Sequence, residues 1–234
     1  MKYQLIRSSR RKTVALQIKA AKLIVRAPQN IELSYIDNFV QSKSLWIKDK
    51  VSQQQASAQI AVNNFNNGDL VYIDGLPHKI VVDYGKMSVR CNSAEGFISV
   101  YIPAKYQQQS FSKEDISAKV KLLIEEWFNS EVCYYLTLKL PALYEQTSLI
   151  ATSFKVRKYK SRWGSCNNRG ELSFNCLLKM LPPWVVDYVI VHELCHLKYL
   201  NHSTKFWQLV ENHCPDMHLA KAWMKKNQPA FTWS

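Results

Sequence analysis

The sequence predicts an α+β protein. A β-rich N-terminal region with one helix, residues 1–105, is expected to precede a more helical domain, residues 106–234. Apolar and polar residues alternate along several short N-terminal segments, a period of two that is typical of half-buried strands. From about residue 114, apolar residues instead recur at helical spacing. Hydrophobic residues make up 47% of the 234 residues, so a packed core is expected and a disordered chain is not.

The N-terminal region begins with two or three predicted strands within residues 3–27. An amphipathic helix is predicted over residues 31–56. The turn-rich segment NNFNNGD, residues 63–69, then interrupts the chain. Four further strands are predicted within residues 70–103, carried by LVYID, HKIVVDY, MSVRC and FISVYIP.

The second region opens with a long predicted helix over residues 114–139, whose apolar stripe is more typical of a core face than of a binding face. Two strands are then predicted, FKVRKYK at residues 154–160 and ELSFN at residues 171–175. They flank the loop SRWGSCNNRG, residues 161–170. Two further helices are predicted after these strands.

Pro182 and Pro183 suit the start of the next helix, and Ser203 is a plausible N-cap for the one after it. The intervening segment VVDYVIV, residues 185–191, is rich in β-branched residues and also fits a buried strand. We predict a helix because the His-Glu-x-x-His pattern that follows is useful only at helical spacing.

The formal net charge of +13 favours acidic partners such as nucleic acid. No nucleic-acid-binding motif accompanies this charge, so a basic solvated surface is the preferred interpretation. The N-terminus lacks the apolar core of a secretory signal, and the apolar stretches are too short for a membrane span. A cytoplasmic protein without membrane association is therefore expected, and its oligomeric state is unknown.

Six cysteines are spread along the chain without any C-x-x-C pair. A zinc ribbon is excluded because it requires such pairs. We expect free, buried thiols rather than a disulfide framework.

A candidate metal site lies in the segment that contains His192, Glu193 and His196. Side chains at positions i and i+4 of a helix share one face, so the two imidazoles can reach a single zinc ion. Glu193 points to the side, where it can reach a zinc-bound water without ligating the metal. This arrangement predicts metal-assisted hydrolysis with Glu193 as general base.

A catalytic zinc ion usually has three protein ligands, and His202 is the preferred third one. A continuous helix would carry His202 about 9 Å further along the axis than His196, so the helix is expected to end near residues 199–200 and the chain to turn back. Three other side chains remain open as the third ligand: Glu211, His213 and His218.

The sequence resembles the YgjP-like metallopeptidases and, more distantly, SprT-type zinc proteases. The resemblance is carried by RWGSC (residues 162–166), by Pro182 and Pro183, and by DYVIVHELCHLKYLNHSTKFW (residues 187–207). The N-terminal RRKTVALQIK and KLIVRAP and the region of Trp46 and Ile47 also resemble the family. The similarity therefore extends over most of the chain.

This resemblance implies a zincin-like domain with an active-site helix beside a small sheet. It also implies zinc as cofactor, with His192, His196 and His202 as its ligands, Glu193 as general base, and a peptide or protein as substrate. SprT-type proteins often add a cysteine-based zinc module, and its absence here weakens that branch.

The SRWGSC segment is expected to border the cleft, where Trp163, Gly164 and Ser165 are candidate substrate-binding residues. A structural turn packed by Trp163 is an equally weighted interpretation. Tyr199, His213 and Arg162 are candidates for stabilising the oxyanion. Two other functions stay open: hydrolysis of a non-peptide amide or ester, and a DNA-associated protein that uses its positive charge to find substrates.

Overall fold

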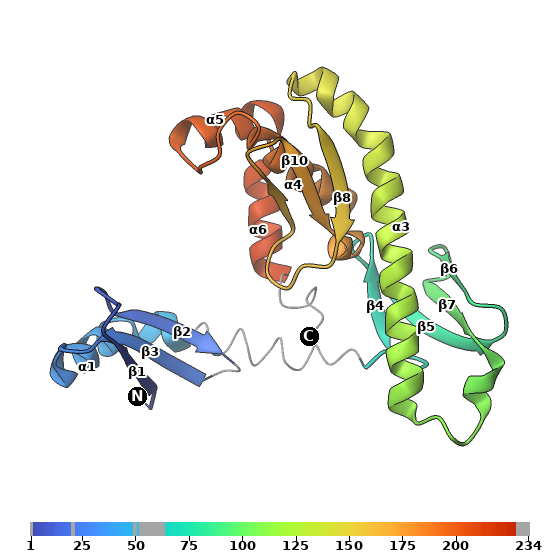
Figure 1. Ribbon diagram of the computed structural model, residues 1–234, viewed down its shortest axis with the longest axis horizontal. Coiled ribbons are helices and arrows are strands. Elements are labelled where there is room, and N and C mark those ends of the chain that lie inside the picture. Colours follow the sequence, from blue (N-terminus) through green and yellow to red (C-terminus); the bar gives the residue numbers. More distant parts are fainter. Residues whose placement is uncertain (1, 20–21, 49–50, 52–63, 228–234) are drawn as a thin grey trace. The chain divides into compact units, whose positions relative to one another are not determined.

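The computed structural model describes residues 2–19, 22–48, 51 and 64–227. Contacts within the chain divide it into two compact units, Met1–Val62 (unit 1) and Asn63–Ser234 (unit 2) (Figure 1). This division does not coincide with the boundary expected at residues 105/106, because strands from the segment 70–102 belong to the core of unit 2. The fold class is the α+β class that the sequence predicts.

Unit 1 is a three-stranded sheet with a helix packed on one face. The strands are β1 (Gln4–Ser8), β2 (Ala15–Lys19) and β3 (Lys22–Pro28), and the helix is α1 (Leu33–Ser42). The central strand β3 is parallel to β1 and antiparallel to β2. Alternate residues of β3 and the inner face of α1 form a separate small core: Leu23, Val25, Ala27, Ile36 and Val40, joined by Ile47.

The helix predicted over residues 31–56 is interrupted in the structure. α1 ends at Ser42, Lys43 lies in a turn, and residues 44–48 are helical again. Most of the remaining predicted helix falls outside the described residues.

The first part of unit 2 is a four-stranded sheet. Its strands are β4 (Leu70–Ile73), β5 (Leu76–Tyr84), β6 (Ser88–Asn92) and β7 (Phe97–Ile102), in the order β4-β5-β7-β6. The four predicted strands all form, and alternate residues of β7 are buried. A short 3₁₀ helix, η1 (Ala104–Gln107), leads to the long helix α3 (Lys113–Thr147).

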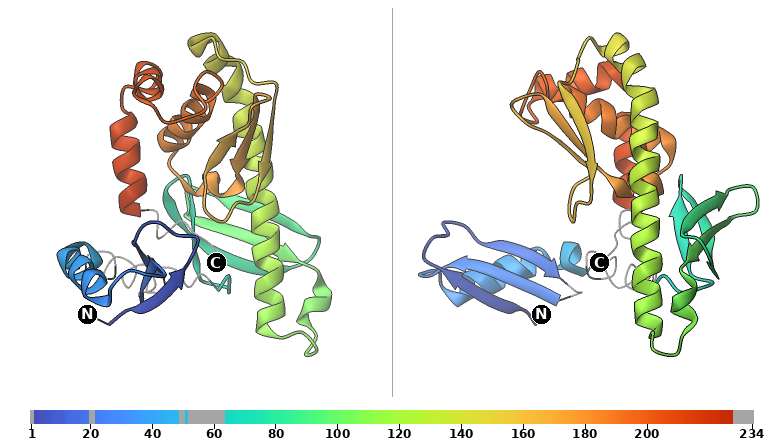
Figure 2. Two further views of the ribbon diagram at one scale, coloured as in Figure 1. Left: turned by 60° about the vertical axis from the view of Figure 1, so that its left-hand side comes forward. Right: turned by 45° about the vertical axis from the view of Figure 1, so that its right-hand side comes forward.

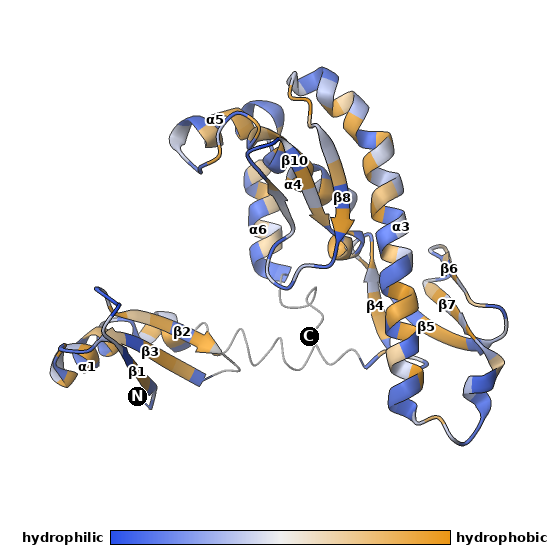
Figure 3. Ribbon diagram, in the orientation of Figure 1, coloured by the Kyte–Doolittle hydropathy of each residue, from blue (hydrophilic) through white to orange (hydrophobic). Residues whose placement is uncertain are grey.

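Helix α3 runs the length of unit 2 (Figures 1 and 2). A capping box between Ser112 and Asp115 fixes its start, as each side chain bonds the other residue's backbone N–H. The predicted end at residue 139 is wrong, because the helix continues through Pro141 to Thr147. Leu143 and Tyr144, which are partly buried against the core, extend the apolar stripe past the proline, and this packing offsets the lost hydrogen bond. Figure 3 shows apolar and polar residues interspersed along α3.

A second sheet of unit 2 contains β8 (Ser153–Arg157), β9 (Gly164–Cys166) and β10 (Glu171–Asn175) in the order β8-β10-β9. The central strand β10 is parallel to β8 and antiparallel to β9. The sequence prediction treated residues 161–170 as a loop, whereas three of them form the edge strand β9. The predicted strand 154–160 ends earlier, at Arg157.

The chain then forms the 3₁₀ helix η2 (Cys176–Met180) and the helices α4 (Pro183–Cys195), α5 (Thr204–His213) and α6 (Met217–Asn227). The segment 185–191 is thus helical, as predicted. It lacks an amphipathic pattern because α4 is buried on nearly all sides.

The turn between β4 and β5 fixes the start of α4. The backbone N–H groups of Asp74 and Gly75 donate to the carbonyls of Lys179 and Met180, at 2.7 and 2.9 Å. The Asp74 carboxylate also pairs with Lys179 Nζ at 2.8 Å. Gly75 has φ +85° and lies against Pro182, where a Cβ atom would approach Pro182 Cγ to 2.6 Å. The first sheet thereby positions the helix that carries the candidate site.

All six cysteines are free. The expectation that all are buried is wrong, since only two are: Cys176 and Cys195. In the residues that the structure describes, no helix combines the length and the apolar character needed to cross a bilayer.

Candidate metal centre

Helix α4 brings His192 and His196 to the same side of unit 2. Pro183 occupies its first turn, and the last helical residue is Cys195, with His196 as the C-cap at helical backbone angles. The helix therefore ends about four residues earlier than predicted. Three turn residues follow, with the N–H groups of Lys198 and Tyr199 both bonded to the carbonyl of Cys195.

The chain turns back after this helix, as the sequence predicted. Asn201 Oδ1 accepts the backbone N–H of Ser203 at 3.2 Å, a local bond that stabilises the turn. Ser203 in turn caps α5 by accepting from the N–H of Phe206. His202 lies between these two anchored residues, so its position is set by the turn and by the helix start together.

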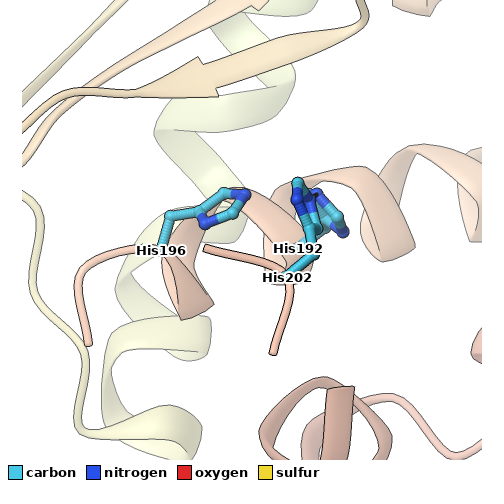
Figure 4. Close-up of side chains that lie close together, drawn as sticks. All are labelled: His192, His196 and His202. Carbon is cyan, nitrogen blue, oxygen red and sulfur yellow. Dashed lines mark hydrogen bonds between the residues drawn. The ribbon is translucent and has the colours of Figure 1, made fainter. Parts of the chain in front are cut away.

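The three imidazole rings of His192, His196 and His202 converge (Figure 4). One potential ligand atom from each residue lies within 4.8 Å of the others. The Nε2 atoms of His192 and His202 are 3.1 Å apart. Two ligands on a tetrahedral zinc ion, at bond lengths of about 2.0–2.1 Å, are about 3.3 Å apart. The spacing between these two nitrogens is therefore close to that of two ligands of one ion.

The protonation of His196 also suits a metal ligand. Its Nδ1 atom is 2.9 Å from the carbonyl oxygen of Tyr199, which can only accept a hydrogen bond. Nδ1 therefore carries the hydrogen, and Nε2 keeps its free lone pair. Such a hydrogen bond to a backbone carbonyl is the usual way in which proteins orient a ligating imidazole.

His192 is in the neutral form that metal binding requires. Burial, with smaller contributions from His196 and His202, lowers the pKa of His192 to about 3. Its Nδ1 atom is buried without a hydrogen-bond partner among the described residues. Its Nε2 atom faces that of His202 and is the nitrogen available to a metal. The donor set, three neutral imidazoles, fits a zinc ion.

Two aromatic rings from α5 hold the histidines. Phe206 is fully buried and stacks on His196, with ring centroids 4.5 Å apart and an angle of 24° between the planes. It also contacts His192 and His202 edge-on. Trp207 stacks on His202 at 5.4 Å and 30°. The rings thus have little freedom to rotate.

Glu193 lies beside the histidines and is only 6% exposed. Burial raises the pKa of its carboxyl group to about 8, while the positive charge of Arg162 opposes this shift. Strand β9 approaches the carboxylate at Gly164, which leaves no room for a side chain there.

A pocket of about 610 Å³ opens beside Glu193 and His192. Of the candidate substrate-binding residues, Trp163 and Gly164 line it. Ser165 does not, because its hydroxyl bonds to the hydroxyl of Tyr159 at 3.0 Å. Of the three candidates for oxyanion stabilisation, Arg162 lines the pocket, whereas Tyr199 and His213 do not.

The sequence analysis missed several pocket residues. They come from the buried face of α4 and from α6: Tyr188, Val189, Lys221, Ala222, Met224 and Lys225. No local sequence signal marks them, because only the fold brings α6 beside α4.

The alternative third ligands lie outside the cluster. Among the described residues, the group that could hold a metal ion contains neither Glu211 nor His213 nor His218. The carbonyl oxygen of His213 accepts a bond from Gln146 at 3.4 Å. His218 is exposed.

Comparison with known proteins agrees with this geometry. The family model described as YgjP-like, metallopeptidase domain, matches residues 12–227 and so includes residues of both units. Neither the curated proteins nor the solved structures contain a match.

Proposed function

This chain belongs to the YgjP-like metallopeptidase family, and we propose that it is a zinc-dependent peptidase whose ion is held by His192, His196 and His202. The observation that carries the proposal is the convergence of these three imidazoles, with potential ligand atoms within 4.8 Å of one another. A bound zinc ion supplies Lewis-acid activation of water near neutral pH.

Glu193 is the proposed general base. Its buried carboxylate lies one residue after His192 and lines the pocket. Burial makes it a stronger base than an exposed carboxylate, as its raised pKa of about 8 indicates. It accepts the proton of the attacking water and then delivers that proton to the leaving nitrogen of the peptide bond.

Strand β9 is the proposed binding edge for an extended substrate. In its sheet, β9 pairs with β10 on one side and with no other described strand on the opposite side. A peptide can add to such an edge through backbone hydrogen bonds. In this proposal Trp163 and Gly164 contact the substrate in the pocket, and Ser165 takes part only through its backbone.

Three variants test the assignment. Glu193→Gln should retain zinc and lose peptide hydrolysis, whereas His192→Ala should lose both. His218→Ala is the matched control, since it removes an exposed histidine outside the cluster and should change neither. Zinc is measured by elemental analysis of freshly purified protein, and hydrolysis with a panel of peptides. Loss of zinc from Glu193→Gln would mean that Glu193 is a ligand instead.

The same panel separates peptidase activity from hydrolysis of other bonds. It should include small amides and esters, and cleavage of these alone would replace the peptidase proposal. A cytoplasmic location remains part of the proposal and is tested by cell fractionation.

A further inference from the structure

The pocket beside Glu193 has a cationic rim. Arg162, Lys221 and Lys225 all line the pocket and all are exposed. Within the part of the chain that the structure describes, none of the three forms an ion pair with a carboxylate. The pocket therefore presents three positive charges that no acidic side chain of the described residues neutralises by contact.

Aromatic rings hold two of these cations in place. Lys221 Nζ lies 3.8 Å from the ring centroid of Trp207, and the guanidinium carbon of Arg162 lies 5.6 Å from that of Tyr159. Cation–π contacts orient a positive charge without cancelling it. The long side chains are thus restrained while their charge stays available to a ligand.

The placement of the two lysines on α6 also points to a ligand. Lys221 and Lys225 are four residues apart, so they share a helix face, where like charges repel each other. An anion bound between them would relieve this repulsion.

Among the residues that the structure describes, only one acidic side chain lines the pocket, and it is not available as a partner for the rim. Glu193 is buried, and it is the proposed general base. The three rim residues line the same pocket as Glu193 and His192. The rim is therefore close to the position where the substrate reacts in the proposed mechanism.

The remaining wall of the pocket is largely apolar or aromatic. It is formed by Trp163, Tyr188, Val189 and Met224. Such a wall suits an apolar side chain, whereas the rim suits a negative charge.

Resting on the proposed peptidase function, we propose that this pocket selects peptides that carry a carboxylate next to an apolar side chain, with Arg162, Lys221 and Lys225 binding the carboxylate. The carboxylate belongs either to the free C-terminus of a short peptide or to an aspartate or glutamate side chain close to the cleaved bond.

Four peptides test the substrate preference on the full-length, zinc-loaded protein. They share one apolar sequence and differ in two positions: the C-terminus is a free acid or an amide, and one residue is glutamate or glutamine. We expect kcat/KM to be about tenfold or more higher for the preferred carboxylate than for its neutral partner. The preference should shrink as ionic strength rises, because the rim is exposed. A preference within the acid/amide pair would show that the pocket binds the C-terminal carboxylate. A preference within the glutamate/glutamine pair would show that it binds the side-chain carboxylate.

Variants of the rim test its part in this preference. In Lys221→Gln/Lys225→Gln, the ratio of kcat/KM for the carboxylate and neutral peptides should fall toward one. Lys225→Glu should lower the ratio further. The matched control is Lys226→Gln, which removes an exposed lysine of the same helix that does not line the pocket and should leave the ratio unchanged. Circular dichroism and zinc content verify that each variant is folded and loaded.

The outcomes separate the two proposals. If the wild-type protein cleaves none of the peptides, the peptidase proposal fails. If it cleaves all four with equal kcat/KM, the peptidase proposal stands and the carboxylate preference is wrong. An unchanged ratio of kcat/KM values in the double lysine variant would show that these lysines do not bind the carboxylate.

Discussion

Gly164 of β9 and Glu193 of α4 lie so close together that a side chain on Gly164 would overlap the side chain of Glu193. A Cβ atom on Gly164 would be 2.6 Å from Cγ and 2.7 Å from Oε1 of Glu193. The φ angle of Gly164 lies outside the left-handed region, so the backbone conformation alone does not require glycine. Glycine is needed here because only a residue without a side chain leaves room for Glu193. The edge strand and the proposed general base are therefore positioned as one unit.

We predict that Gly164→Ala displaces the Glu193 carboxylate and lowers kcat for peptide hydrolysis by about 100-fold, because small misplacements of a reacting group are costly. Zinc content should stay the same, since the three atoms nearest to the added Cβ all belong to Glu193 and none to a histidine. The control is Gly85→Ala, where a Cβ atom would meet no atom within 4 Å. Equal activity of the two alanine variants would show that Glu193 has room to move without loss of function.

Phe206 is expected to set the zinc affinity through its contacts with all three histidine rings. Phe206→Leu should weaken zinc binding by about 10- to 100-fold, the usual effect of losing a group that orients metal ligands. Phe128→Leu provides the control, because that ring is also fully buried but belongs to α3. Competition with a chelating dye measures both affinities, and a similar decrease in the two variants would point to general destabilisation.

Asp187 joins α4 to α3 through two hydrogen bonds, from Tyr135 Oη at 2.6 Å and from Lys139 Nζ at 2.9 Å. Tyr135→Phe removes the first bond and should lower the free energy of unfolding by about 1 kcal/mol, measured by urea denaturation. The neighbouring Tyr134 is 66% exposed, so Tyr134→Phe is the matched control and should have no effect. Equal stability of both variants would mean that the bond makes no net contribution.

The sequence predicts the elements of this fold better than their ends and their grouping. The four strands β4–β7 follow from apolar periodicity and turn residues, whereas helix α4 follows from the His-Glu-x-x-His spacing. A domain boundary was expected at residues 105/106 because composition changes there. The sequence does not show that the β4–β5 turn bonds to Lys179 and Met180, about a hundred residues later. Likewise, β9 is too short to show a period of two, and pairing with β10 alone makes it a strand.

The residues of the candidate site also differ in how far the sequence predicts them. His192, Glu193 and His196 are set by helical spacing, and the preference for His202 rested on a turn that the structure contains. Lys221 and Lys225 could not be found from the sequence, because nothing near them marks a site. Their position beside Glu193 depends on how α6 packs against α4.

Removal of the metal gives a final prediction about stability. A ligand that binds only the folded state stabilises it by about 2.7 kcal/mol when its free concentration is 100 times Kd. Chelation with EDTA should therefore lower the Tm of the zinc-loaded protein, and readdition of zinc should restore it.

The effect should depend on His202, which is exposed and contributes little to the core. In EDTA, His202→Ala should unfold at nearly the same temperature as the wild-type protein, because an exposed side chain buries little surface on folding. In zinc, only the wild-type protein and the His218→Ala control should gain stability. If zinc raised the Tm of His202→Ala as much as that of the wild-type protein, His202 would not be a ligand. The increase in Tm measures how strongly zinc binds the folded chain, and loss of a ligand must weaken that binding.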